Sequence, residues 1–153
     1  MREASTDDAP AIAALDARVN ASPWSADAVR ETLQRAGGFV FCMPDGALAG
    51  FVLFTVVADE CEILDIAIDP EYRRAGRASR LLEAAQRAAA DRGATRCLLE
   101  VRESNASAQA FYHSAGFAVT GRRRDYYRTT TGGREDALLM SRSIARENGS
   151  CPS

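Results

Sequence analysis

Apolar and polar positions along the 153-residue chain switch repeatedly between the alternation typical of strands and the three-to-four-residue spacing typical of helices. Glycine, proline and aspartate punctuate the apolar runs, and Ser25 and Asn105 stand where helix caps are expected. The pattern predicts four helices. The first runs from a cap at Thr6 or Asp7 to Val19, the second runs from Ser25 to about Arg35 and is ended by Gly37-Gly38, and the others cover 78–91 and 105–115. Strands are predicted over 39–43, 48–57, 61–68, 96–101, 117–128 and 134–142.

This order of segments predicts a mixed α/β fold with a central sheet flanked by helices. The segment 61–68 is apolar on both faces near its end, so we expect it at the centre of the sheet. A chain of this length supplies one hydrophobic core, and we therefore predict a single domain over residues 1–144. The small and polar residues 145–153 are expected to form a frayed tail.

The junction between the strand 61–68 and the helix 78–91 is the first candidate for chemistry. It reads Arg-Arg-Ala-Gly-Arg-Ala over 73–78, so a glycine and a small residue allow close approach of a ligand to the main chain. The free N–H groups and the dipole of a helix N-terminus favour an anion there. A hexapeptide this short is also found at ordinary strand-to-helix turns, where the arginines are merely solvated.

A second motif lies downstream, where 105–117 reads Asn-Ala-Ser-Ala-Gln-Ala-Phe-Tyr-His-Ser-Ala-Gly-Phe. The pair R-x-x-G-x-A and N-x-x-A-x-x-x-Y-x-x-x-G-F resembles the GCN5-related N-acetyltransferase (GNAT) family, whose members transfer an acetyl group from acetyl-CoA to an amine. Stretches around Trp24, over 99–105 and over 123–140 resemble the RimI type within that family, the ribosomal-protein alanine N-acetyltransferases. The resemblance covers the chain from about residue 5 to about 142.

The resemblance implies the GNAT fold, a mostly antiparallel mixed sheet in which the parallel strands 61–68 and 96–101 splay apart around acyl-CoA. The main chain of the first strand would pair with the pantetheine arm, and the turn after it would hold the pyrophosphate. The residues expected to bind the cofactor are Ile66, Ala67, Ile68, Arg73, Arg74, Ala75, Gly76, Arg77, Ala78, Ser79 and Asn105.

Glu100 and Tyr112 are the candidate catalytic residues. Glu100 lies in the strand that would border the cleft and matches the general base of the RimI type, although a strand glutamate can also simply face solvent. Glu103 ranks second, because three residues along an extended segment it should point to the other face. The phenol of Tyr112 can protonate the departing thiolate of CoA, or its ring can merely pack against the sheet. Asn105 can cap its helix and contact the cofactor as well.

Aromatic residues are expected to form the slot for the acceptor amine. Trp24, Tyr126 and Tyr127 are the candidates, and because neighbouring strand residues point to opposite faces, only one of the two tyrosines can line the slot. We favour Tyr127. The arginines 122–124 either contact the acceptor or form a solvated strand edge.

Composition excludes several other classes of protein. All 19 basic residues are arginine, which removes the P-loop lysine and the lysine Schiff base, and a single histidine, His113, excludes a multi-histidine metal site. The four cysteines show no C-x-x-C spacing, so we expect reduced thiols rather than disulfides or a metal site.

A net charge of −2 argues against general nucleic-acid binding. No apolar run approaches the ~20 residues of a membrane span, and the acidic start lacks a secretion signal, so we expect a cytoplasmic protein.

We therefore predict an acetyl-CoA-dependent enzyme, without a metal, that acetylates the N-terminal alanine of a small-subunit ribosomal protein. An α-amine with a pKa near 8 is roughly a tenth neutral at pH 7. This fraction is much larger than for a lysine side chain, so an α-amine depends less on a strong general base. Two alternatives stay open at this point. One is an acetyltransferase for lysine side chains or small-molecule amines on the same scaffold, and the other is a non-catalytic acyl-CoA-binding or partner-binding module.

Overall fold

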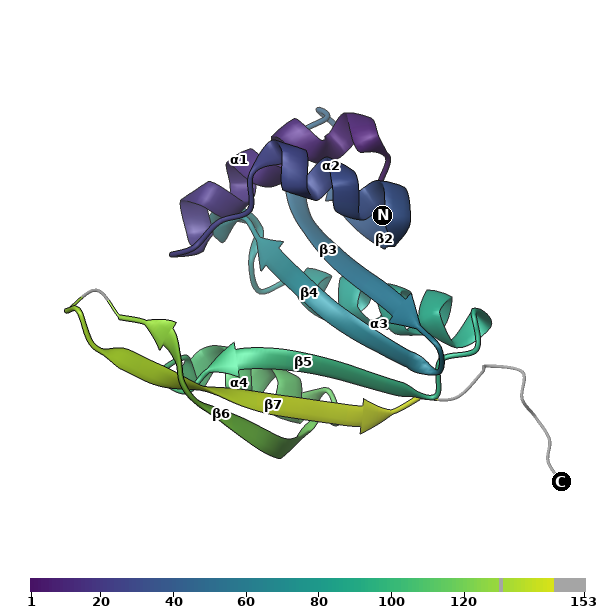
Figure 1. Ribbon diagram of the computed structural model, residues 1–153. Coiled ribbons are helices and arrows are strands. Elements are labelled where there is room, and N and C mark those ends of the chain that lie inside the picture. The colour runs from purple at the N-terminus through teal and green to yellow at the C-terminus, as the bar shows by residue number, and fades with distance from the viewer. Residues whose placement is uncertain (130, 145–153) are drawn as a thin grey trace, which may run out of the picture.

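A sheet of seven strands in the order β1-β2-β3-β4-β5-β7-β6 forms the centre of the computed structural model, which describes residues 1–129 and 131–144 (Figure 1). The strands are β1 (Arg2–Glu3), β2 (Gly37–Cys42), β3 (Leu48–Val57), β4 (Glu60–Ile68), β5 (Arg96–Arg102), β6 (Ala118–Arg128) and β7 (Arg134–Ser143). The α-helices are α1 (Ala9–Val19), α2 (Ala26–Arg35), α3 (Arg77–Asp91) and α4 (Ala106–Ser114), and short 3-10 turns cover Thr6–Asp8 and Pro70–Tyr72.

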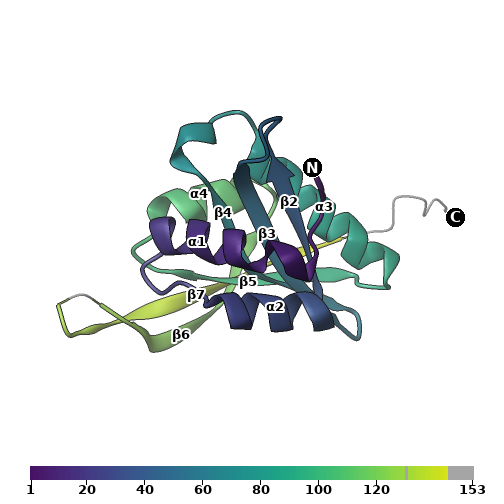
Figure 2. The same ribbon diagram turned by 90° about the horizontal axis from the view of Figure 1, so that it is seen from above.

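Helices cover both faces of the sheet, with α1 and α2 on one side and α3 and α4 on the other (Figure 2). A separate apolar core fills each interface. The first core joins Leu81 and Leu82 of α3 to Leu99 of β5 and to Phe117, which follows α4. The second joins Ile12 and Leu15 of α1 and Val29 of α2 to Val40, Phe51 and Leu53 of the sheet. This arrangement confirms the predicted mixed sheet flanked by helices.

The pair β4 and β5 is parallel, whereas the other neighbouring strands of the described sheet are antiparallel. Within the described residues, three pairs join these two strands, Glu60 with Arg96, Cys61 with Cys97 and Glu62 with Leu98. Beyond them the strands diverge (Figure 1), while β4 runs on to Ile68 and β5 to Arg102. The splayed pair expected from the family resemblance is therefore present.

A β-bulge in β4 changes which side chains face α1. Leu53 of β3 pairs with Asp65, and its neighbour Phe54 pairs with Ile63, so Leu64 is an extra residue in the ladder. An extra residue of this kind places two consecutive side chains on one face of the sheet. Leu64 packs into the α1 and α2 core, and Asp65 contacts Asn20 at the end of α1.

Two local predictions were wrong. Thr6 and Asp7 do not cap α1; Ser5 begins the preceding 3-10 turn in a capping box with Asp8. Gly37 and Gly38 belong to β2 rather than to a helix stop, and a Cβ atom at Gly37 would lie 2.8 Å from the Phe54 ring. These glycines are needed for close packing in the sheet. The predicted frayed tail, 145–153, lies outside the described residues.

Candidate active site

A cleft of about 620 Å³ opens where β4 and β5 diverge. It is lined from β4, from the turn that precedes α3, from the first turn of α3 and from α4. The residues predicted to hold the cofactor line this cleft, with the exception of Ala75, which is not among the described residues that form its wall. Val19, Asn20, Tyr72, Ser107, Ala108, Phe111 and Tyr112 complete the lining.

Gly76 gives the cleft an open helix N-terminus. It is the N-cap of α3 with φ of 73°, a left-handed conformation that glycine adopts without strain, and it provides no side-chain acceptor for the first N–H groups of the helix. Within the described chain, no atom beyond Gly76 and its two chain neighbours lies within 4 Å of the position that a Cβ atom would take. The turn therefore leaves room for an anion at the positive end of the helix dipole.

Arginines surround this helix terminus, and two of them are held by the main chain. Arg77 Nη1 donates to the carbonyl oxygen of Tyr72 at 2.8 Å, and Arg73 Nε donates to that of Ile68 at 3.3 Å. The Arg77 guanidinium also lies 5.3 Å from the centroid of the Phe41 ring. Because the arginines add charge to the helix dipole, the cleft is suited to a diphosphate.

A second pocket of about 280 Å³ adjoins the cleft, and Tyr112 lines both. Trp24, Asp65, Glu100, Arg102 and Tyr127 line it. The second pocket shares Asn20, Ile66, Asn105, Ala108 and Tyr112 with the larger cleft. Since the two spaces have these walls in common, a group bound in one can approach a group bound in the other beside Tyr112.

Tyr112 is almost completely buried, with 8% of its surface exposed. Its ring packs edge-on against Phe117, with the ring centroids 5.8 Å apart, and contacts Phe111. Burial raises the pKa of the Tyr112 phenol above its ordinary value, and the nearby Asp65 and Cys97 raise it further. The phenol therefore stays protonated in the physiological range and is available as a proton donor.

Asn105 begins α4 and also lines both spaces. Its Oδ1 accepts a hydrogen bond from the Ala108 N–H at 3.1 Å, which is the contact of an N-cap, and another from the Ser107 hydroxyl. Its presence in both walls is consistent with the two roles predicted for it.

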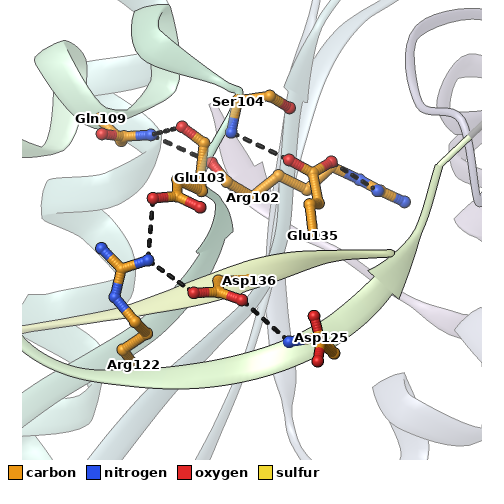
Figure 3. A network of polar contacts seen from close by, with 8 residues as sticks. All are labelled: Arg102, Glu103, Ser104, Gln109, Arg122, Asp125, Glu135 and Asp136. Atoms are coloured by element: carbon orange, nitrogen blue, oxygen red, sulfur yellow. Dashed lines mark hydrogen bonds and ion pairs between the residues drawn. The ribbon is translucent and has the colours of Figure 1, made fainter. Parts of the chain in front are cut away.

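Glu100 lies in the wall of the smaller pocket, and its side chain is 20% exposed. Its Oε1 lies 3.2 Å from Nη2 of Arg123. Glu103 is held differently, because its Oε1 accepts from Arg122 Nη1 at 2.8 Å beyond the end of β5 (Figure 3). The structure thus separates the two glutamates as their spacing suggested.

Tyr127 contributes to the smaller pocket, whereas the Tyr126 side chain stands at the surface with 46% of the residue exposed. The Arg102 guanidinium covers the Tyr127 ring, 4.3 Å from its centroid. Trp24 also lines this pocket, and its main-chain N–H donates to Asp16 Oδ2 at 2.8 Å. Of the two tyrosines considered, Tyr127 is the one that the fold brings to Trp24.

A polar network ties the β6–β7 hairpin to the end of β5 (Figure 3). Arg122 donates to both Glu103 and Asp136, and Asp136 in turn accepts from the Asp125 N–H at 2.9 Å. Glu135 pairs with Arg102 at 3.0 Å and accepts from the Ser104 N–H. The network fixes the hairpin that carries Tyr127. Arg122 makes its contacts within this network, and Arg123 makes a separate ion pair with Glu100.

Sequence reasoning missed Asn20, Asp65 and Arg102 as pocket residues. Asp65 faces this side because of the bulge at Leu64, which leaves no local signal in the sequence. Arg102 could have been found, since a strand that alternates apolar and charged positions toward its end places Arg102 on the face of Glu100.

Two absences hold for residues 1–129 and 131–144, the part of the chain that the structure describes. Over these ranges, no group of three or more His, Cys, Asp or Glu side chains is placed to hold a metal ion. No helix there is long and apolar enough to cross a membrane.

Comparison with known proteins adds independent evidence. Residues 7–117 match the model of the acetyltransferase (GNAT) family. The ribosomal protein bS18 alanine N-acetyltransferase of Escherichia coli is 40% identical over 141 residues, which are 92% of this chain and 94% of the relative. The enzyme of the same name from Haemophilus influenzae is 30% identical over 127 residues, covering 83% of this chain and 86% of the relative.

A solved structure agrees with these relatives. The crystal structure of the ribosomal-protein-S18-alanine N-acetyltransferase from Escherichia coli superposes with a TM-score of 0.84 at 38% identity, covering 97% of this chain and 98% of that one. The chain therefore belongs to the acetyltransferase (GNAT) family, and within it to the RimI-like N-acetyltransferases.

Proposed function

We propose that this enzyme transfers the acetyl group of acetyl-CoA to the α-amine of a protein N-terminus, and that its acceptor is the N-terminal alanine of ribosomal protein bS18. The observation that carries the proposal is the position of Tyr112 in the shared wall of two pockets, with Glu100 in the smaller of them. The names of the similar proteins support the choice of acceptor.

The larger cleft fits acetyl-CoA. Its diphosphate matches the open N-terminus of α3 and the arginines around Gly76. Its pantetheine amides match the edge of β4 at Ile66, Ala67 and Ile68, where the described strands β4 and β5 no longer pair. We assign the cofactor to these residues and the acceptor N-terminus to the pocket of Trp24 and Tyr127.

Within this arrangement Glu100 is the general base and Tyr112 is the general acid. Bound acetyl-CoA supplies the thioester carbonyl carbon. Glu100 takes a proton from the acceptor amine, directly or through one water molecule, and Tyr112 gives its phenolic proton to the thiolate that leaves. The raised pKa of Tyr112 suits this task, because the phenol carries its proton until the step requires it. We place the reaction in the cytoplasm, where ribosomal proteins are made.

The test offers the enzyme acetyl-CoA and synthetic peptides. One peptide begins with a free alanine, a matched peptide carries a blocked N-terminus and an internal lysine, and a free polyamine serves as the third acceptor. Mass spectrometry and release of CoA should show turnover at the free α-amine at least tenfold faster than at the other amines. Faster turnover of the lysine or the polyamine would assign a different acceptor, and binding of acetyl-CoA without any turnover would remove the enzymatic assignment.

A further inference from the structure

A fully buried and a half-buried carboxyl group meet at the wall of the smaller pocket. Asp16 of α1 is fully buried, and Asp65 of β4 contacts it from the sheet. The bulge at Leu64 brings Asp65 to this face. Two carboxylates in contact with little access to water repel each other, so a stable pair of this kind shares one proton.

Hydrogen-bond partners around the pair indicate where that proton lies. Asn20 Nδ2 donates to Oδ1 of both aspartates, and the Trp24 N–H donates to Asp16 Oδ2. Asp65 Oδ2 is buried and receives no donor from the described part of the chain. A buried carboxylate oxygen without a partner is costly, whereas a proton held between Asp65 and Asp16 satisfies it.

We infer that Asp16 and Asp65 are positioning residues of the acceptor site, and that one shared proton between them holds the segment from Asn20 to Trp24 against the pocket. Asp16 acts on Trp24 through the main-chain N–H of that residue, and Asn20 bridges both carboxyl groups. The link to acetyl transfer rests on the proposed function. The link to the position of Trp24 stands without it.

Because of the shared proton, the position of the segment from Asn20 to Trp24 should depend on pH. Burial first, and then contact with Asp16, raise the pKa of Asp65 from its ordinary value of 3.8 to about 8. Loss of the proton leaves two adjacent negative charges, which we expect to push Asp16 away from Asp65 and to release Trp24 from its position.

Other charged or titratable groups face Asp65 from the elements around it. They are Asp16 on α1, Tyr112 on α4, Glu100 and Arg102 on β5 and Tyr127 on β6. Burial raises the pKa of both tyrosines, so they remain neutral well above pH 8. Glu100 and Arg102 are each in an ion pair, with Arg123 and Glu135.

The first test uses Trp24, the single tryptophan of the chain, as an internal fluorescent probe. Intrinsic fluorescence of the protein without substrates is followed from pH 6.5 to pH 9.5 in the wild type, in Asp65→Asn and in Asp27→Asn. Asp27 is a matched control, because its side chain is 95% exposed on α2. We expect a transition near pH 8 in the wild type and in Asp27→Asn. It should be absent in Asp65→Asn, because the asparagine amide donates to Asp16 at every pH.

A second variant covers the case in which Asp65→Asn does not fold. Asp16→Asn can donate to Asp65 with its amide while its oxygen still accepts from the Trp24 N–H, so it should also lose the transition. A wild-type protein without a transition, or a folded variant that keeps it, would overturn the inference.

The second test measures KM and kcat for an alanyl peptide between pH 7 and pH 9. If the protonated pair is the form that binds the peptide, the peptide KM of the wild type should rise about tenfold relative to that of Asp65→Asn, while the KM for acetyl-CoA changes little in either. Comparison with the variant removes the titration of the peptide amine itself. Parallel KM profiles in the two proteins would disprove the positioning role and leave the proposed reaction intact. If the enzyme does not turn over the peptide at all, the proposed function fails, and the fluorescence experiment still tests whether the shared proton positions Trp24.

Discussion

Glu100 Oε1 and Arg123 Nη2 are 3.2 Å apart, in an ion pair that links β5 to β6 across the intervening strand β7. The register places the two side chains diagonally on one face of the sheet, one strand apart. Arg123 pairs with Ala137 of β7, and Gly121 pairs with Leu139, the partner of Glu100. Arg123 therefore holds the Glu100 carboxylate at the wall of the smaller pocket, which is the proposed site of the acceptor amine.

Glu100→Gln should lower kcat for the alanyl peptide by roughly 10²–10⁴, because glutamine has nearly the same shape and cannot accept the proton. Glu103→Gln is the matched control, since Glu103 is held by Arg122 outside the pocket and its loss should change kcat less than threefold. Steady-state kinetics with both variants make the comparison. A loss below threefold in Glu100→Gln would exclude this residue as the base.

Tyr112→Phe should lower kcat by a similar roughly 10²–10⁴, while the affinity for acetyl-CoA stays within a few-fold. The phenylalanine ring keeps the contacts with Phe111 and Phe117, and only the hydroxyl is lost. Because the pKa of Tyr112 is raised, its deprotonation should not limit the wild-type rate below pH 10. Calorimetric titration with acetyl-CoA and single-turnover kinetics separate the two effects, and an unchanged single-turnover rate would assign the proton donation elsewhere.

Local signals in the sequence were sufficient for most helices and strands and for the glycine turn that precedes α3. Ser25 and Asn105 do cap α2 and α4, because a cap is a contact between a side chain and the N–H group three residues later. The open terminus of α3 at Gly76 likewise depends on a few consecutive residues. Features of this kind are determined by a few neighbouring residues, so they can be predicted from the sequence without knowledge of the fold.

Features that depend on strand register could not be read in this way. The choice between Tyr126 and Tyr127 is decided by an irregularity between Arg123 and Tyr127 in the pairing of β6 with β7. The position of Asp65 is decided by the bulge opposite Leu53, which is set by pairing with β3. A shift of one residue moves a side chain to the other face, and neighbouring residues alone do not specify it.

Gly50→Ala should destabilise the fold by about 1–3 kcal/mol and raise the KM for acetyl-CoA. A Cβ atom at Gly50 would lie 2.4 Å from Ile68 Cδ1 and 2.9 Å from the Ala67 carbonyl oxygen, so β4, which lines the larger cleft, must move. Gly133→Ala is the control, because among the residues that the structure describes its Cβ atom would meet only Thr129 Oγ1, at an ordinary 3.5 Å. Urea unfolding and acetyl-CoA kinetics measure both effects, and equal results for the two variants would contradict the packing argument.

Asp65→Asn should change how the free energy of unfolding depends on pH. The pKa of Asp65 is 3.8 in its ordinary state and about 8 in the fold, so between these values the folded protein holds a proton that the unfolded chain releases. The wild type therefore loses stability as pH rises from 4 to 8, by at most about 1.4 kcal/mol per pH unit from this group.

Asp8, Asp69 and Asp136 act in the opposite sense, because their pKa values are lowered and their contributions are lost as pH falls toward the acid range. We would measure the free energy of unfolding of the wild type and of Asp65→Asn in urea at pH 5, 6.5 and 8. The contributions of Asp8, Asp69 and Asp136 are the same in both proteins, so they cancel in the difference. The wild type should become progressively less stable relative to the variant along this series, because the asparagine amide donates to Asp16 without any proton to lose. If the free energy of unfolding changed with pH in parallel in the two proteins, Asp65 would already be ionised at pH 5, and this result would exclude the shared proton.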